Sequence, residues 1–164
     1  MQIRPETTAD HEAIHALTAA AFAPMPYSDG SEPDIIRKLR ADGDLSLSLV
    51  ATDGTNIIGH IAFSPVTLND ISDNWYGLGP ISVAPSQQKS GVGRALIHAG
   101  FEWLHTQNAR GCVLIGDPNY YSRFGFISDG NLTYQDLPTE YIQWIGWNGN
   151  TAAGTLRYSP GFEP

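Results

Sequence analysis

The stretch LGPISVAPSQQKSGVGRALIHA, from Leu78 to Ala99, decides the fold because it joins an apolar strand to a glycine-containing turn that leads into an amphipathic helix. Ile81 to Val83 is typical of a buried strand that ends at Pro85, and apolar residues recur at near-helical spacing from Leu96 to Leu104. The turn between them, Gln88 to Arg94, has glycines that let backbone N–H groups approach an anion. Its basic side chains and the helix dipole add positive charge. The stretch therefore predicts a phosphate-binding turn.

The order of residues in this turn excludes two well-known phosphate-binding loops. A Walker loop requires GxxxxGK[ST], but here Lys89 precedes Gly91. A dinucleotide-binding fingerprint requires GxGxxG after the first strand, whereas this turn lies in the middle of the chain with no acidic partner at the expected distance. What remains is QxxGxG, formed by Gln88, Gly91 and Gly93 between a strand and a helix.

The QxxGxG turn resembles the acetyl-CoA pyrophosphate loop of the GNAT acyltransferases. A second segment, GDPNYYSRFGF from Gly116 to Phe126, contains the Tyr-x-x-x-Gly-Phe pattern of that family. Together with Ile58 to Pro65 and Leu78 to Pro80, it is similar to the YhbS-like branch of predicted N-acetyltransferases. The resemblance implies an α/β (α+β) fold with a mixed, mostly antiparallel sheet flanked by helices, and acetyl-CoA as acyl donor.

The resemblance also implies roles for individual residues. Tyr121 matches the tyrosine that protonates the departing thiolate, a role that a phenol can perform because it is a hydrogen-bond donor at neutral pH. The backbone N–H of Val83 is expected to polarise the thioester carbonyl. The expected cofactor-binding residues are Ile81, Ser82, Val83, Gln88, Lys89, Ser90, Gly91, Val92, Gly93, Arg94, Asn119 and Tyr121. The spacing of Asn119 departs from the family pattern, so capping is an alternative role for it.

The general base is the role that the sequence determines least. Glu32, in the expected substrate-binding helix, is one candidate, and His60, Asp70 and Asp73 are others. Water-mediated deprotonation is also open. Neither Ser64 nor Cys112 belongs to a local nucleophile motif, which argues against covalent acyl transfer.

Composition bounds the class of protein. The chain has 164 residues, a formal net charge of −8 and a single cysteine, Cys112, so it needs no internal disulfide and is expected in the cytoplasm. The negative charge argues against nucleic acid and anionic membranes as partners, and no signal-like or membrane-spanning segment occurs. His11 and His15 share a helix face but lack a third ligand, so no metal is expected.

The periodicity predicts one domain over residues 1–164, with the motif-bearing core in 1–127 and few patterns in 128–164. We expect helices over 9–22 and 31–40, a hairpin of strands 45–51 and 56–66 around Asp53-Gly54, and a third antiparallel strand over 75–83. A short strand over 112–115 and a helix beginning at Asp117-Pro118 follow, then a loop over 129–138 and a strand over 141–147.

These observations predict an acetyl-CoA-dependent N-acetyltransferase that acts on a primary amine of a small molecule or peptide by direct attack in a ternary complex. The alternative is a non-catalytic acyl-CoA-binding or regulatory module. A homodimer is plausible by resemblance to the family. Substrate pockets of this fold form from the first two helices and the C-terminal strands, where this sequence has few motifs, so the acceptor is not identified.

Overall fold

The computed structural model describes residues 1–164. Its α-helices are α1 (His11–Phe22), α2 (Glu32–Asp42), α3 (Val92–Thr106) and α4 (Pro118–Tyr121). Its strands are β1 (Gln2–Pro5), β2 (Leu47–Asp53), β3 (Asn56–Leu68), β4 (Ile71–Val83), β5 (Gly111–Ile115), β6 (Leu132–Thr133), β7 (Ile142–Gly146) and β8 (Gly154–Tyr158).

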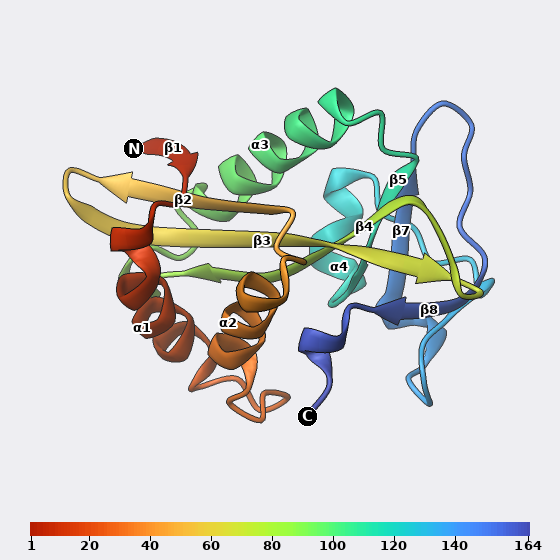
Figure 1. Cartoon of the computed structure of the whole chain (residues 1–164), viewed down its shortest axis with the longest axis horizontal. Coiled ribbons are helices and arrows are strands. Elements are labelled where there is room, and N and C mark those ends of the chain that lie inside the picture. The colour runs from red at the N-terminus through yellow and green to blue at the C-terminus, as the bar shows by residue number, and fades with distance from the viewer.

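The strands form a mixed sheet in the order β1-β2-β3-β4-β5-β7. All neighbours on this path are antiparallel except β4 and β5, which run parallel because α3 connects them. The strand β8 pairs with the far end of β3 at Val66–Leu68, and β6 pairs with β8. Figure 1 shows the long β3 running through the middle of this arrangement.

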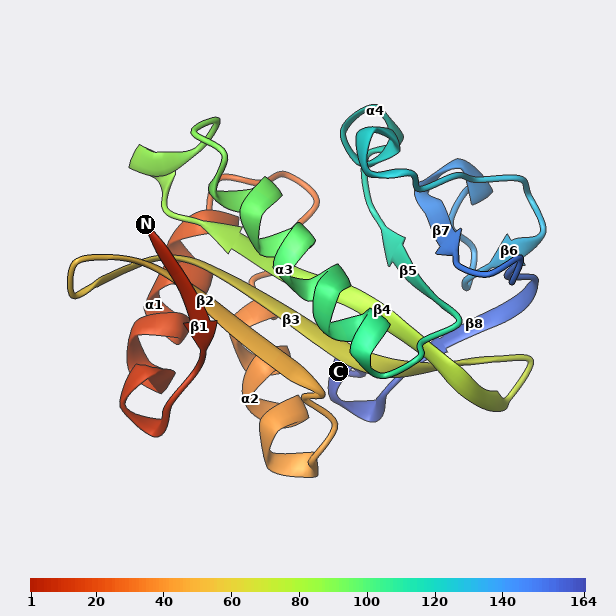
Figure 2. The same ribbon diagram turned by 90° about the horizontal axis from the view of Figure 1, so that it is seen from above.

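Helices cover the two faces of the sheet. On one face, Leu96 and Ile97 of α3 pack with Leu49 and Ile61 in the largest core cluster. On the other face, Ile14 of α1 and Ile36 of α2 pack on Val50 of β2. Figures 1 and 2 show α3 on one side of the sheet, and α1 and α2 on the other. Alternate residues of β2, β3 and β4 therefore face different helices.

The structure confirms the predicted order of elements up to Phe126. The Asp53-Gly54 turn joins β2 to β3, and Pro118 lies in the first turn of α4. Beyond that point, β7 confirms the strand expected over 141–147, but the sequence did not predict β6 or β8. No helix of the structure is long and apolar enough to cross a membrane.

Candidate active site

The site begins where β4 and β5 separate. These strands pair only between Trp75–Gly77 and Gly111–Val113, and Figure 2 shows them diverging beyond that point. The Ala84 N–H donates to the Ile58 carbonyl of β3 at 2.8 Å. Because antiparallel hydrogen-bonding pairs alternate along a ladder, the N–H and C=O groups of Ile81 and Val83 point away from β3. They face the gap between β4 and β5.

The turn that follows β4 presents a row of free backbone donors. The backbone N–H groups from Lys89 to Arg94 donate no hydrogen bond within the protein, and the first bond of α3 is donated by the Ala95 N–H to the Gly91 carbonyl at 3.1 Å. Gly91 has φ +92°, a left-handed conformation that favours glycine. Free backbone donors at the positive end of a helix dipole are suited to bind an anion.

The turn and the strand gap open into one cleft. Its lining residues come from the end of α1 and the loop after it, the end of β4, the turn, α3 and the α4 region. They are Ala21, Phe22, Met25, Tyr27, Ile81, Ser82, Val83, Gln88, Lys89, Gly91, Gly93, Arg94, His98, Tyr120, Tyr121, Arg123 and Phe124. Oxygen-rich phosphate groups fit its basic turn, and an extended chain with amide groups fits the exposed backbone of β4.

Tyr121 reaches the cleft from α4, whose start is fixed by Asp117. The Asp117 carboxylate accepts from the Asn119 N–H at 2.9 Å and so caps the helix. A Cβ at Gly116 would lie 2.7 Å from a Tyr121 ring carbon, so the absence of a side chain there makes room for the ring. Burial raises the pKa of the Tyr121 phenol, with Tyr120 adding to the shift. The phenol is therefore protonated at neutral pH and has a proton to donate.

The structure brings most of the predicted site residues together, but not all. Those that line the cleft are Ile81, Ser82, Val83, Gln88, Lys89, Gly91, Gly93, Arg94 and Tyr121. The Gln88 amide donates to the Val83 carbonyl at 3.3 Å and so ties the turn to the strand. Val92 instead points into the core, Ser90 donates to the Gln87 carbonyl, and Asn119 lies outside the cleft lining.

The candidate bases lie apart from the cleft lining. Glu32 accepts from the Ser28 hydroxyl at 2.6 Å at the start of α2. Asp70 pairs with Arg157 at 3.2 Å, and the Asp73 carboxylate likewise pairs with an arginine at 3.2 Å, both near the end of β4 opposite to Val83. His60 is fully buried in β3. None of the four reaches the cleft surface directly.

Several cleft residues were missed by sequence reasoning. Phe22, Met25 and Tyr27 carry no local motif, because they join the cleft only when the loop after α1 packs beside β4. Arg123 lies with its guanidinium carbon 4.6 Å from the centroid of the Tyr120 ring. Arg123 and Tyr120 lie within the GDPNYYSRFGF segment, and their closeness to Tyr121 in the sequence could have indicated that they line the same cleft.

Metal and thiol chemistry receive no support from side-chain clusters. No three His, Cys, Asp or Glu side chains gather in a way that could hold a metal ion. Burial raises the pKa of the Cys112 thiol, which packs in the core beneath α3. A buried thiol of raised pKa is a poor nucleophile.

Comparison with known proteins places this geometry in a family. The model of the acetyltransferase (GNAT) family matches residues 12–126. The uncharacterized N-acetyltransferase YhbS of Escherichia coli K12 is 37% identical over 127 residues, which cover 77% of this chain and 73% of that protein. Streptothricin acetyltransferase A of Bacillus subtilis 168 is 29% identical over 126 residues, covering 65% of this chain and 68% of that protein.

Two solved structures of acetyltransferases have a similar fold to this chain. A GNAT family acetyltransferase from Brucella melitensis in complex with acetyl-CoA has a TM-score of 0.89 and 41% identity, covering 99% of this chain and 97% of that one. Escherichia coli YhbS in complex with CoA has a TM-score of 0.89 and 30% identity, covering 99% and 92%. The predicted fold and the prediction of an acetyl-CoA-dependent N-acetyltransferase are confirmed. The chain belongs to the GNAT family of acetyltransferases.

Proposed function

We propose that the chain transfers an acetyl group from acetyl-CoA directly to a primary amine of a small molecule or peptide, with both substrates in the cleft between β4 and α4. The observation that carries the proposal is the convergence of three features on one cleft. They are the free amides of the turn, the outward-facing backbone of Ile81 and Val83, and the protonated phenol of Tyr121.

The pyrophosphate and the pantetheine arm of acetyl-CoA would contact different parts of this cleft. The amides from Lys89 to Arg94, together with the basic side chains of those two residues, would hold the pyrophosphate. The N–H and C=O groups of Ile81 and the C=O group of Val83 would pair with the amides of the pantetheine arm as a neighbouring strand does, which leaves the Val83 N–H for the thioester. This arrangement would direct the thioester towards the end of β4, beside Tyr121.

The reaction follows from the groups at that end. Acetyl-CoA supplies a thioester whose carbonyl carbon accepts the amine and whose sulfur leaves. The Val83 N–H would stabilise the negative charge that develops on the carbonyl oxygen. Tyr121 would donate its proton to the sulfur as the carbon–sulfur bond breaks. The amine loses one proton as the carbon–nitrogen bond forms, and this proton restores the phenol.

The acceptor would enter between Tyr121 and the loop after α1. Phe22, Met25 and Tyr27 line that part of the cleft, and the Tyr27 side chain is 76% exposed. Apolar and aromatic groups there favour an acceptor with an apolar portion next to its amine. The likeness to streptothricin acetyltransferase A supports a small molecule as acceptor.

Replacement of Tyr121 by Phe tests the proposed acid. We expect Tyr121→Phe to lower kcat by roughly 100-fold, since general acid catalysis contributes about 10²–10⁴ in rate, while the Kd for acetyl-CoA is unchanged. The measurement is steady-state release of the CoA thiol with an accepted amine, paired with calorimetric binding of acetyl-CoA.

Tyr120→Phe is the matched control, because Tyr120 lines the same cleft one residue away and has no proposed proton to donate. This control should retain kcat within about threefold of the unmodified chain. Equal rates for Tyr121→Phe and Tyr120→Phe at every pH would remove Tyr121 from the acid role.

A further inference from the structure

The face of the sheet beneath α1 and α2 contains a buried polar chain that the proposed mechanism has not used. Arg40 donates two hydrogen bonds of 2.9 Å to Glu6, and the Ser48 hydroxyl also donates to Glu6. The Ser48 oxygen lies 2.8 Å from Nε2 of His60. His60 is 0% exposed and Ser48 is 8% exposed. Polar groups are rarely buried on this scale without a role in structure or chemistry.

The direction of these hydrogen bonds assigns the proton on His60. Burial opposes ionisation of Glu6, but the hydrogen bonds from Arg40 and Ser48 outweigh it and lower the pKa of Glu6. An ionised carboxylate can only accept a hydrogen bond, so the Ser48 hydroxyl donates its single proton to Glu6. The Ser48 oxygen must then accept from His60, which places the imidazole proton on Nε2. The other ring nitrogen, Nδ1, then carries no proton and has a free lone pair.

His60 lies directly beside the strand that carries the cleft. His60 and Ser82 are directly opposite each other in the β3–β4 ladder, so their side chains lie on the same face, with Cβ atoms about 5 Å apart. Nδ1 of His60 and the hydroxyl of Ser82 are both buried without a hydrogen-bond partner in the protein. Ser82 is also one of the residues that line the cleft, and a rotation of its side chain about the Cα–Cβ bond would carry the buried hydroxyl towards the cleft.

We propose that His60 is the base of the reaction and acts through Ser82, with Ser48 and Glu6 as its positioning residues. This inference rests on the proposed function. The attacking amine gives its proton to the Ser82 hydroxyl, which passes its own proton to Nδ1 of His60, reached by rotation of the Ser82 side chain or through one water molecule. The imidazolium keeps its Nε2–H bond to Ser48, whose bond to the Glu6 carboxylate stabilises the positive charge. After the sulfur has taken the proton of Tyr121, His60 gives the amine's proton back through Ser82 to the Tyr121 phenolate in the cleft, so that no proton is gained or lost.

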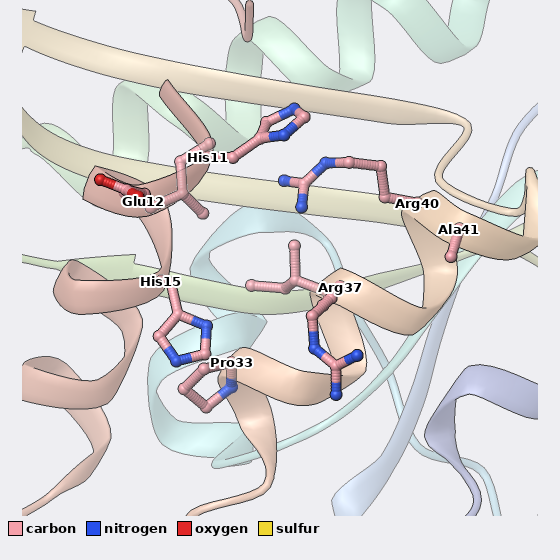
Figure 3. Close-up of a pocket in the computed structure, with 9 residues that line it drawn as sticks. His11, Glu12, His15, Pro33, Arg37, Arg40 and Ala41 are labelled. Carbon is pink, nitrogen blue, oxygen red and sulfur yellow. The ribbon is translucent and has the colours of Figure 1, made fainter. Parts of the chain in front are cut away.

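The surroundings of His60 keep its imidazole neutral at pH 7. Glu6 after β1, His11 on α1 and Arg40 on α2 are the titratable groups nearest to this chain, and His11 lies 2.8 Å from Glu6. Figure 3 shows His11 and Arg40 converging in the groove between the two helices. Burial lowers the pKa of His60 to about 4, opposed by Glu6 and reinforced by Arg40. At neutral pH the imidazole is therefore unprotonated at Nδ1, and it would hold a proton taken from the amine only transiently.

The first test is spectroscopic and needs no acceptor. In ¹⁵N-labelled protein at pH 7, long-range ¹H–¹⁵N correlation should show His60 with its proton on Nε2 and a bare Nδ1. In Ser48→Ala this fixed tautomer should be lost, and in Ser64→Ala it should persist. Ser64 is the control because it is also a buried serine in the sheet, lies in β3 and has no hydrogen-bond partner to lose. A proton on Nδ1 of the unmodified chain would overturn the proposal.

The second test compares the pH dependence of kcat for an accepted amine. Ser48→Ala and Ser82→Ala should each lower kcat at pH 7 by about 10-fold or more, and the loss should shrink at high pH, where hydroxide removes the amine proton. The KM for acetyl-CoA should stay unchanged in Ser48→Ala, and Ser64→Ala should follow the unmodified chain. Ser82→Ala removes a hydroxyl without a partner, so it keeps the test valid if Ser48→Ala folds poorly.

The outcomes separate this inference from the proposed function. If the unmodified chain acetylates an amine and the Ser48 and Ser82 variants match Ser64→Ala at every pH, His60 is not the base, although the proposed function stands. If the unmodified chain acetylates no amine, the proposed function fails and this inference fails with it.

Discussion

His60 shows how one buried side chain links stability to pH. Burial lowers the pKa of the imidazole from 6.5 to about 4, whereas in the unfolded chain it returns to the ordinary value. The unfolded chain therefore binds more protons between these two values. His60 contributes its full stabilisation above pH 6.5, and that contribution is lost as the pH falls towards 4.

We therefore expect His60→Gln to weaken the acid sensitivity of the fold. The difference in free energy of unfolding between the unmodified chain and the variant should change by roughly 3 kcal/mol between pH 7 and pH 4, in favour of the variant at low pH. Urea unfolding at several pH values measures this difference. Parallel stability curves for the two proteins would show that His60 is not held neutral in the folded state.

At the residue scale, local patterns identified some site residues and missed others for a physical reason. Gln88 to Arg94 and Tyr121 stand within short motifs whose neighbours in sequence are also neighbours in space. The contact of His60 with Ser48 depends on the β2–β3 pairing, and that of Glu6 with Arg40 spans 34 residues. No short window of sequence contains such contacts, so only the structure places them together.

At the element scale, the turn into α3 is the part of the site that tolerates substitution least. Gly91 has φ +92°, and a Cβ at Gly93 would lie 3.3 Å from the Tyr120 hydroxyl and 3.7 Å from a methyl carbon of Val83. A side chain at Gly93 would therefore project among groups that line the cleft. The backbone of this turn must remain accessible for an anion to reach its N–H groups.

We expect Gly91→Val and Gly93→Val each to weaken acetyl-CoA binding by at least about 10-fold in Kd, as measured by calorimetry. Gly130→Val is the matched control for Gly91→Val, because Gly130 also has a positive φ, +80°, but lies outside the cleft. It should impose similar backbone strain without loss of affinity. Unaltered binding by both turn variants would refute the assignment of the phosphate-binding turn.

The elements also show where periodicity succeeds and where it fails. The β2–β3 hairpin was predictable from two apolar runs around Asp53-Gly54, and α3 from its apolar spacing. The strand β8 was not predicted because Gly154–Tyr158 is short and only Leu156 within it is buried. Its pairing with Val66–Leu68 of β3 is a contact between distant segments, which local propensity does not report.

At the scale of the whole molecule, the C-terminal segment is built into the core. Leu156 is 2% exposed and packs in a cluster with Val66 and Trp75. A Cβ on Gly161 would lie 3.1 Å from the backbone nitrogen of Leu39, so the end of the chain contacts α2 closely. We propose on the basis of these contacts that residues 1–164 form a single domain, in which residues 128–164 extend the sheet and pack against α2.

Leu156→Ala tests this view of the C-terminal segment. The substitution should lower the free energy of unfolding by roughly 2–5 kcal/mol, because it leaves a cavity in a packed cluster. Urea denaturation should still show one transition for the entire chain. Leu137→Ala, at a side chain 41% exposed, is the control and should have little effect. A separate early transition in Leu156→Ala would indicate that the C-terminal segment unfolds independently.

The central claim is that one cleft both binds acetyl-CoA and transfers its acetyl group to an amine. The most direct measurement is release of the CoA thiol over a panel of small-molecule and peptide amines, with acetylated products identified by mass spectrometry and the melting temperature recorded with and without acetyl-CoA. We predict a higher melting temperature with acetyl-CoA and equal amounts of thiol and acetylated amine for at least one acceptor. A higher melting temperature with no acetylated product across the panel would contradict the account and identify the chain as an acyl-CoA-binding module.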